Sequence, residues 1–149
     1  MSRGWQVEVA SSVAGAPPAT RVRGAVGRIR RALRASRVAG PRGKSELSIL
    51  FCGDVRMRSL NRRFRRKDRS TDVLSFPAGG GTLLGDIVIC VPFAARKARR
   101  LPGGTSREMD RLLLHGYLHL LGYDHETDHG EMDALETAVS GRLSLHPRP

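Results

Sequence analysis

The segment from His115 to His125 constrains the fold of this chain more than any other stretch. His115 and His119 lie four residues apart, so on a helix their imidazoles leave the same face one turn apart. The residues before them are apolar on most sides, which predicts a buried central helix over 105–121. Gly122 follows this helix and can adopt the left-handed conformation that ends a helix. The resulting turn can bring His125 back toward the other two histidines.

The spacing of these three histidines predicts a metal site. Three neutral imidazoles suit Zn²⁺ and leave a fourth position open for water, which is the catalytic rather than the structural arrangement. Ni²⁺ or Co²⁺ would fit the same ligands, and affinity order alone does not choose among the metals. The alternative is a set of helix-surface histidines, but the chain has only two others, His129 and His146. We therefore expect one Zn²⁺ bound by His115, His119 and His125.

The same stretch matches the metzincin protease pattern H-E-x-x-H-x-x-G-x-x-H except at one position. The glutamate of that pattern is the general base for the metal-activated water, and Gly116 stands in its place here. Peptide hydrolysis by that mechanism is therefore disfavoured. Another base or water activated by the metal itself must act, or the substrate must carry its own nucleophile, as RNA does in its 2′-hydroxyl. Asp124 is a candidate base or orienting group, and a turn-forming aspartate is the alternative.

Hydrophobic patterning places the other elements around the central helix. Two helix starts carry capping signals, namely Asp54 and the capping box of Thr105 and Glu108. No internal repeat or second domain is visible, so we expect one compact α/β (α+β) domain, a small mixed sheet of about four strands packed by about five helices. The expected strands lie near 5–10, 47–51, 72–76 and 87–91, and the expected helices near 20–33, 54–64, 92–100, 105–121 and 131–143.

The net charge of +12 is unevenly distributed along the chain. Residues 1–105 hold 22 basic and 6 acidic residues, whereas residues 106–149 hold 4 basic and 8 acidic ones. A body this basic favours a polyanion such as nucleic acid, with solvated surface arginines as the alternative.

The expected location is cytoplasmic. No apolar run approaches the ~18–20 residues of a membrane span, and the N-terminus has no apolar secretory core. Cys52 and Cys90 are too few for a disulfide scaffold, so we expect reduced thiols. Organellar import is a minor alternative, since the first 45 residues are acid-poor and rich in Arg, Ala and Ser, but their strand and helix patterns favour a folded segment.

Four motifs follow one another along the chain: Leu60-Asn61-Arg62, Thr71 to Pro77, Leu84 to Ile89, and His115 to His125 followed by Met132 and Glu136. In this order they resemble the motifs of the YbeY family of bacterial and organellar rRNA maturation factors. The likeness covers roughly residues 5–143 of a single domain over 1–149, with 144–149 as a flexible tail. It implies a single-strand-specific, metal-dependent endoribonuclease that acts in late 16S rRNA 3′ end maturation, ribosome assembly and 70S ribosome quality control.

The resemblance also implies a cleft with the zinc at one end and Arg62 placed to meet a phosphate. A planar guanidinium fits that task, and a solvated helix arginine is the alternative. The candidate catalytic residues are thus Arg62, His115 and Asp124. The implied partners are RNA of the small ribosomal subunit and ribosome-associated proteins, with no membrane, and the chain is expected to be a monomer. Sequence-independent RNA affinity would come from Arg62, Arg63, Arg65, Arg66 and Lys67.

Two other functions stay open at this point. A ribosome-binding assembly factor with a mainly structural zinc predicts RNA binding that survives replacement of His119. A metalloprotease, disfavoured by Gly116, predicts peptide turnover that a chelator inhibits.

Overall fold

A mixed sheet lies at the centre of the structure, which is a computed structural model that describes residues 4–145. The strand order is β1-β2-β4-β3, with β1, β2 and β4 parallel and β3 antiparallel at the edge beside β4. The strands are β1 (Gln6–Ser11), β2 (Glu46–Cys52), β3 (Val73–Pro77) and β4 (Leu83–Cys90). The first three lie close to their expected positions, whereas β4 begins well before the expected residue 87.

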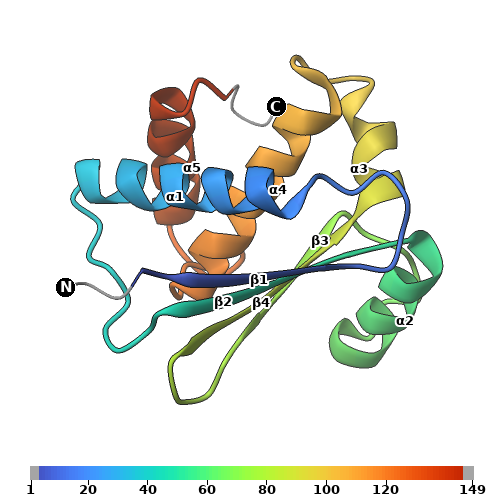
Figure 1. The fold of residues 1–149 in the computed structure, drawn as a ribbon, viewed down its shortest axis with the longest axis horizontal. Helices are drawn as coiled ribbons and strands as arrows, with labels where there is room; N and C mark the ends of the chain where they lie inside the picture. Colours follow the sequence, from blue (N-terminus) through green and yellow to red (C-terminus); the bar gives the residue numbers. More distant parts are fainter. Residues whose placement is uncertain (1–3, 146–149) are drawn as a thin grey trace.

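Helices cover both faces of this sheet (Figure 1). The apolar side chains of β4 alternate between two clusters: Ile87 and Ile89 pack with α4, whereas Val88 and Cys90 pack with Met57 of α2. The fold class is confirmed, as a single α+β domain with a four-stranded mixed sheet and five helices within residues 4–145. The helices are α1 (Ala19–Ala35), α2 (Asp54–Arg65), α3 (Val91–Ala98), α4 (Gly104–Leu120) and α5 (Glu131–Arg142).

The central helix α4 is buried, as its sequence predicts. Leu112, Leu114 and Leu118 have no exposed surface, and the helix packs against α1, α3 and α5 as well as the sheet. Burying one such leucine contributes about 1.5–3 kcal/mol, so α4 is a fixed platform for the residues at its C-terminal end.

Both predicted helix caps are wrong. The N-cap of α4 is Gly103, and Glu108 is fully buried beside Arg111 rather than turned back toward the helix start. The N-cap of α2 is Gly53, while the Asp54 carboxylate accepts hydrogen bonds from α3 and from the loop before β3. For Asp54, tertiary partners outcompete the local backbone for the carboxylate. Glu108 instead pairs with Arg111, one turn further along α4, at 3.3 Å.

The end of the described chain is packed against α5 rather than flexible. Leu145, inside the expected flexible tail, is buried, and its N–H donates to the Ser140 carbonyl at 2.8 Å. The rest of that tail, 146–149, lies outside the described residues. Within residues 4–145, every helix is too short or too polar to cross a membrane.

Candidate metal centre and cleft

Three histidines converge at the C-terminal end of α4. The Nε2 atoms of His115 and His119 lie 3.1 Å apart, one helical turn from each other. Gly122 then adopts φ +101°, and its N–H and that of Tyr123 donate to the last carbonyls of α4 at 3.0 and 3.2 Å. This left-handed ending reverses the chain and brings in His125, so that one ring nitrogen of each histidine lies within 4.8 Å of the others.

The donor set fits a metal ion. Tetrahedral bonds of 2.0–2.1 Å place neighbouring ligand atoms about 3.3 Å apart, close to the separation of His115 and His119. The Nδ1 atom of His115 is hydrogen-bonded to Glu136 Oε2 of α5 at 3.1 Å, which leaves Nε2 for the metal. Burial lowers the pKa of His119, and the neighbouring rings of His115 and His125 lower it further. Each effect favours the neutral, ligating imidazole.

Gly116 lets α4 approach the sheet closely beside this site. A Cβ at this position would lie 2.9 Å from Ile87 Cγ2 and 3.0 Å from Ser75 Oγ. The Ser75 hydroxyl donates to the Gly116 carbonyl at 3.3 Å. Any side chain at this position would be crowded by Ile87 and Ser75, and the position where a metzincin has its general base carries none.

The histidines form one wall of a cleft of about 730 Å³. The opposite wall comes from α2, from the loop that follows it and from β3. Thr71, Asp72 and Ser75 all line the cleft on this side. The cationic lining residues are Arg65, Lys67 and Arg69. A hollow of this size beside a metal-ligating triad accommodates a nucleotide-sized group.

The arginine of α2 that lines the cleft is Arg65, while Arg62 is exposed and outside the lining. The Nη2 atom of Arg65 donates to the Ser75 carbonyl at 2.9 Å, and its guanidinium lies 5.5 Å from the ring centre of Phe76. Arg63 lies over the neighbouring Phe64 ring at 5.2 Å and outside the lining. Of the five predicted RNA-binding residues, Arg65 and Lys67 therefore line the cleft, and Arg62, Arg63 and Arg66 do not.

Two carboxylates near the histidines differ in what they do. Asp124 lines the cleft, and its Oδ1 accepts the Glu126 N–H at 3.0 Å, the contact expected of a turn-forming aspartate. Glu136 is the carboxylate that orients His115. The sequence contained no local signal for that contact, because Glu136 lies on a different helix and reaches the site only through the packing of α5 on α4.

Fold and site together define a small α+β domain with a three-histidine candidate metal site in a cleft lined by charges of both signs. A family model described as "Endoribonuclease YbeY" matches residues 21–144, and the chain belongs to this family. Its relatives with the same name include proteins from Koribacter versatilis (47% identical; 75% of this chain and 72% of the relative) and Solibacter usitatus (44%; 86% and 84%). A relative from Anaeromyxobacter sp. is 52% identical, and the match covers 71% of this chain and 57% of that protein.

A solved structure shares the fold. The solution structure of a Thermotoga maritima protein superimposes with a TM-score of 0.58 at 22% identity, covering 93% of this chain and 92% of the other. The likeness extends over the sheet and its helices and supports the architecture alone.

Proposed function

We propose that this chain is a metal-dependent endoribonuclease that cleaves single-stranded RNA during ribosomal RNA maturation. The observation that carries the proposal is that the three histidines and Arg65 line one cleft, with Gly116 where a peptidase has its base. The family name of the relatives supports the same reaction class. The finer proposals are action at the 3′ end of 16S rRNA, a role in ribosome assembly and 70S quality control, a monomeric state and a cytoplasmic location.

Zinc is the metal we propose, because three imidazoles are a typical catalytic zinc set; Ni²⁺ and Co²⁺ are substitutes. When bound, a divalent cation supplies Lewis acidity toward a phosphodiester and toward water. His115, His119 and His125 would hold it. Glu136 keeps His115 in the ligating tautomer through the 3.1 Å contact with Nδ1.

Arg65 is the side chain we propose to position the phosphodiester. The Ser75 carbonyl holds one end of its guanidinium, and the remaining N–H donors form a fork that suits two phosphate oxygens. Asp124 remains the candidate base or orienting group, since only its Oδ1 has a described hydrogen-bond partner. RNA carries its own nucleophile in the 2′-hydroxyl, so its cleavage does not require the general base that activates water for peptide hydrolysis.

The test is cleavage of single-stranded and duplex RNA by the purified chain, with and without chelator, followed by zinc addition. His119→Ala should reduce cleavage to the chelated level. The exposed His129, which lies outside the cluster, supplies the matched control His129→Ala, which should retain activity. Equal cleavage by the native, chelated and His119→Ala samples would reveal a contaminating nuclease and refute the proposal.

A second pair of variants separates the two arginines of α2. Arg65→Gln should lower kcat on the order of 100-fold, as removal of one charge-stabilising donor typically does, with a smaller change in RNA affinity. Arg62→Gln should change kcat little, because Arg62 lies outside the cleft lining. The reverse result would restore the role that the sequence suggested for Arg62.

The assembly-factor alternative makes the zinc structural. The exposure of His125 and the opening of the triad into a large cleft favour a catalytic site instead. Ribosome binding that survives His119→Ala, with no cleavage by the native chain, would favour the alternative.

A further inference from the structure

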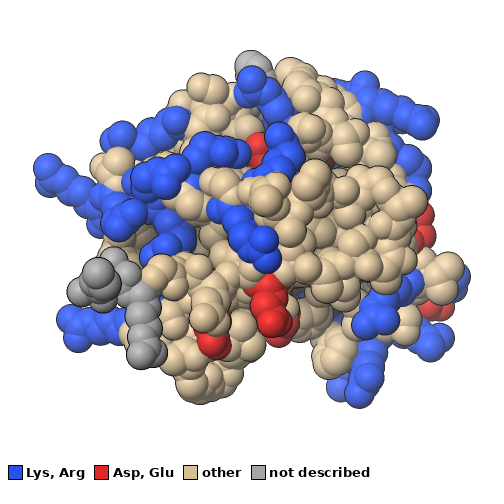
Figure 2. All heavy atoms as spheres, in the orientation of Figure 1, with Lys and Arg blue, Asp and Glu red and all other residues tan. Residues whose placement is uncertain are grey.

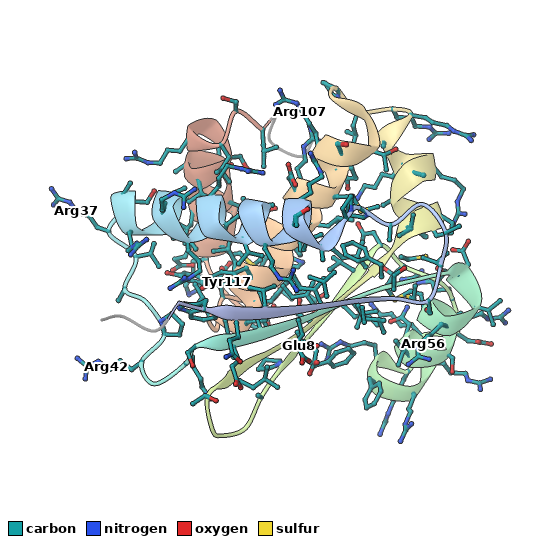
Figure 3. The ribbon with its side chains drawn as sticks, in the orientation of Figure 1. Glu8, Arg37, Arg42, Arg56, Arg107 and Tyr117 are labelled. Atoms are coloured by element: carbon teal, nitrogen blue, oxygen red, sulfur yellow. The ribbon has the colours of Figure 1, made fainter. Side chains whose placement is uncertain are left out.

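Helix α1 and the segment after it carry a strongly basic surface whose function the cleft does not explain. The buried face of α1 is apolar, and its arginines occupy the solvent side. Figure 2 shows Lys and Arg side chains gathered over this helix and its C-terminal end. Arg34, Arg37 and Arg42 are exposed and form no ion pair with any described residue. Arg37 and Arg42 project away from the body in Figure 3.

A groove of about 500 Å³ connects this surface to the cleft. Residues 38–42 and Lys44 line it together with residues 120–123 at the end of α4. Gly122 and Tyr123 line both this groove and the metal cleft, so the two hollows meet at the turn. We call this hollow, lined by 38–42, 44, 84 and 120–123, the flanking groove.

The flanking groove continues toward α1. A smaller hollow of about 50 Å³, lined by Arg30, Arg34 and Tyr117, shares residues 38–41 and Leu121 with it. Tyr117, which lines this hollow, lies beneath α1 in Figure 3. Arg30 stacks over the Trp5 ring at 4.2 Å, which fixes one guanidinium along the route.

The charge of this path has one sign. The charged residues that line the flanking groove are Arg42 and Lys44, and those of the smaller hollow are Arg30 and Arg34. No carboxylate is among the residues lining either hollow. The metal cleft differs, because Asp72, Asp124 and Glu126 line it together with its cations. A purely basic groove beside a cleft with charges of both signs suits a polyanionic strand. Such a strand would pass through the metal cleft and continue into the flanking groove.

We propose that the flanking groove and the arginines of α1 hold the RNA strand that continues beyond the cleaved phosphodiester. This inference rests on the proposed function, because it assigns one occupant, a single-stranded RNA, to both hollows. Tyr123, at the junction, offers an aromatic face on which a base can stack, and the arginines contact phosphates without reading sequence. Substrates long enough to leave the cleft therefore bind more tightly than short ones.

The test compares binding of a short RNA of about five nucleotides with a long one of about 15, both 2′-O-methylated and checked for integrity. Fluorescence anisotropy gives Kd for the native chain, for Arg34→Gln with Arg42→Gln, and for a matched control, Arg99→Gln with Arg100→Gln. The control pair lies just after α3, on the side of the molecule opposite to Arg42 in Figures 1 and 3.

At about 0.1 M salt each lost phosphate contact lowers single-strand affinity about fivefold, so the groove variant should bind the long RNA about 25-fold more weakly. The slope of log K against log salt should fall by about 1.4. Binding of the short RNA should change less than about twofold, as should both affinities of the control. If the groove variant lost equal affinity for the short and the long RNA, the proposed groove would be overturned. The same holds if the groove variant and the control variant lost equal affinity for the long RNA. A native chain that binds and cleaves RNA with no gain from length would refute this inference alone, whereas one that neither binds nor cleaves RNA would refute the proposed function.

Discussion

Replacing Gly116 with alanine sets two effects of similar size against each other. Alanine is favoured over glycine in a helix interior by about 0.8–1.0 kcal/mol. The new Cβ, however, would lie 2.9 Å from Ile87 Cγ2 and 3.0 Å from Ser75 Oγ. Ile87 is 1% exposed on β4, which is hydrogen-bonded on both sides, so it cannot move aside freely. Overpacking of this kind costs about 1–3 kcal/mol, and we expect Gly116→Ala to lower the free energy of unfolding by about 1 kcal/mol.

Gly24 supplies the matched control for this experiment. A Cβ at Gly24 would meet only the Arg28 Nη1 atom at 3.4 Å, the end of a flexible side chain on the exposed side of α1. Gly24→Ala should therefore stabilise the chain by up to about 1 kcal/mol. Urea unfolding with chelator present compares both variants without a contribution from metal binding. Ile87→Ala should cost less in the Gly116→Ala background than in the native chain. Equal stabilisation by the two alanines would refute the close-packing argument.

Two further variants test contacts around the site and around α2. Glu136→Gln should weaken zinc binding about tenfold, because the carboxylate that orients His115 loses its charge. Competition with a chromophoric chelator measures this, and unchanged affinity would mean that packing alone holds His115. Asp54→Asn should lower the free energy of unfolding near neutral pH, since hydrogen bonds from Arg96 and then Ser70 hold the pKa of the Asp54 carboxyl well below its usual range. A lowered carboxyl pKa stabilises the fold above the unfolded value of about 3.9, and this stability is lost as the pH falls through the folded pKa. The difference between native and variant urea midpoints should thus shrink below about pH 4, and a constant difference would contradict the ion-pair explanation.

The elements of the fold were predictable because their periodicities reflect burial. The apolar residues at 87–91 predicted a strand, and β4 packs against α4 on one face and α2 on the other. The apolar surround of 105–121 predicted a central helix, and α4 is that helix. The histidine triad followed from helical spacing and from one glycine, all of which lie within eleven residues of sequence.

Side-chain partners that depend on tertiary packing could not be predicted in the same way. Arg62 and Arg65 lie three residues apart on α2, so they are neighbours on the helix surface and local pattern does not separate them. The position of α2 relative to β3 decides that Arg65 reaches the Ser75 carbonyl. Glu108 fits a capping box equally well in sequence, yet it lies buried beside Arg111. In both errors, the local sequence allowed two roles or two residues, and the packing of the rest of the fold decided between them.

The two hollows also differ in how their affinity for RNA should depend on metal. Cations and carboxylates are balanced among the Lys, Arg, Asp and Glu residues that line the cleft, so a divalent ion held there decides whether the cleft attracts phosphate. The flanking groove has no carboxylate in its lining and should attract phosphate without the metal. Chelation should therefore weaken binding of the short RNA more than that of the long RNA. The affinity for the long RNA divided by the affinity for the short RNA should rise. Anisotropy titrations with and without chelator measure this ratio. A ratio that falls on chelation would mean that the groove binds RNA only when the cleft is already engaged.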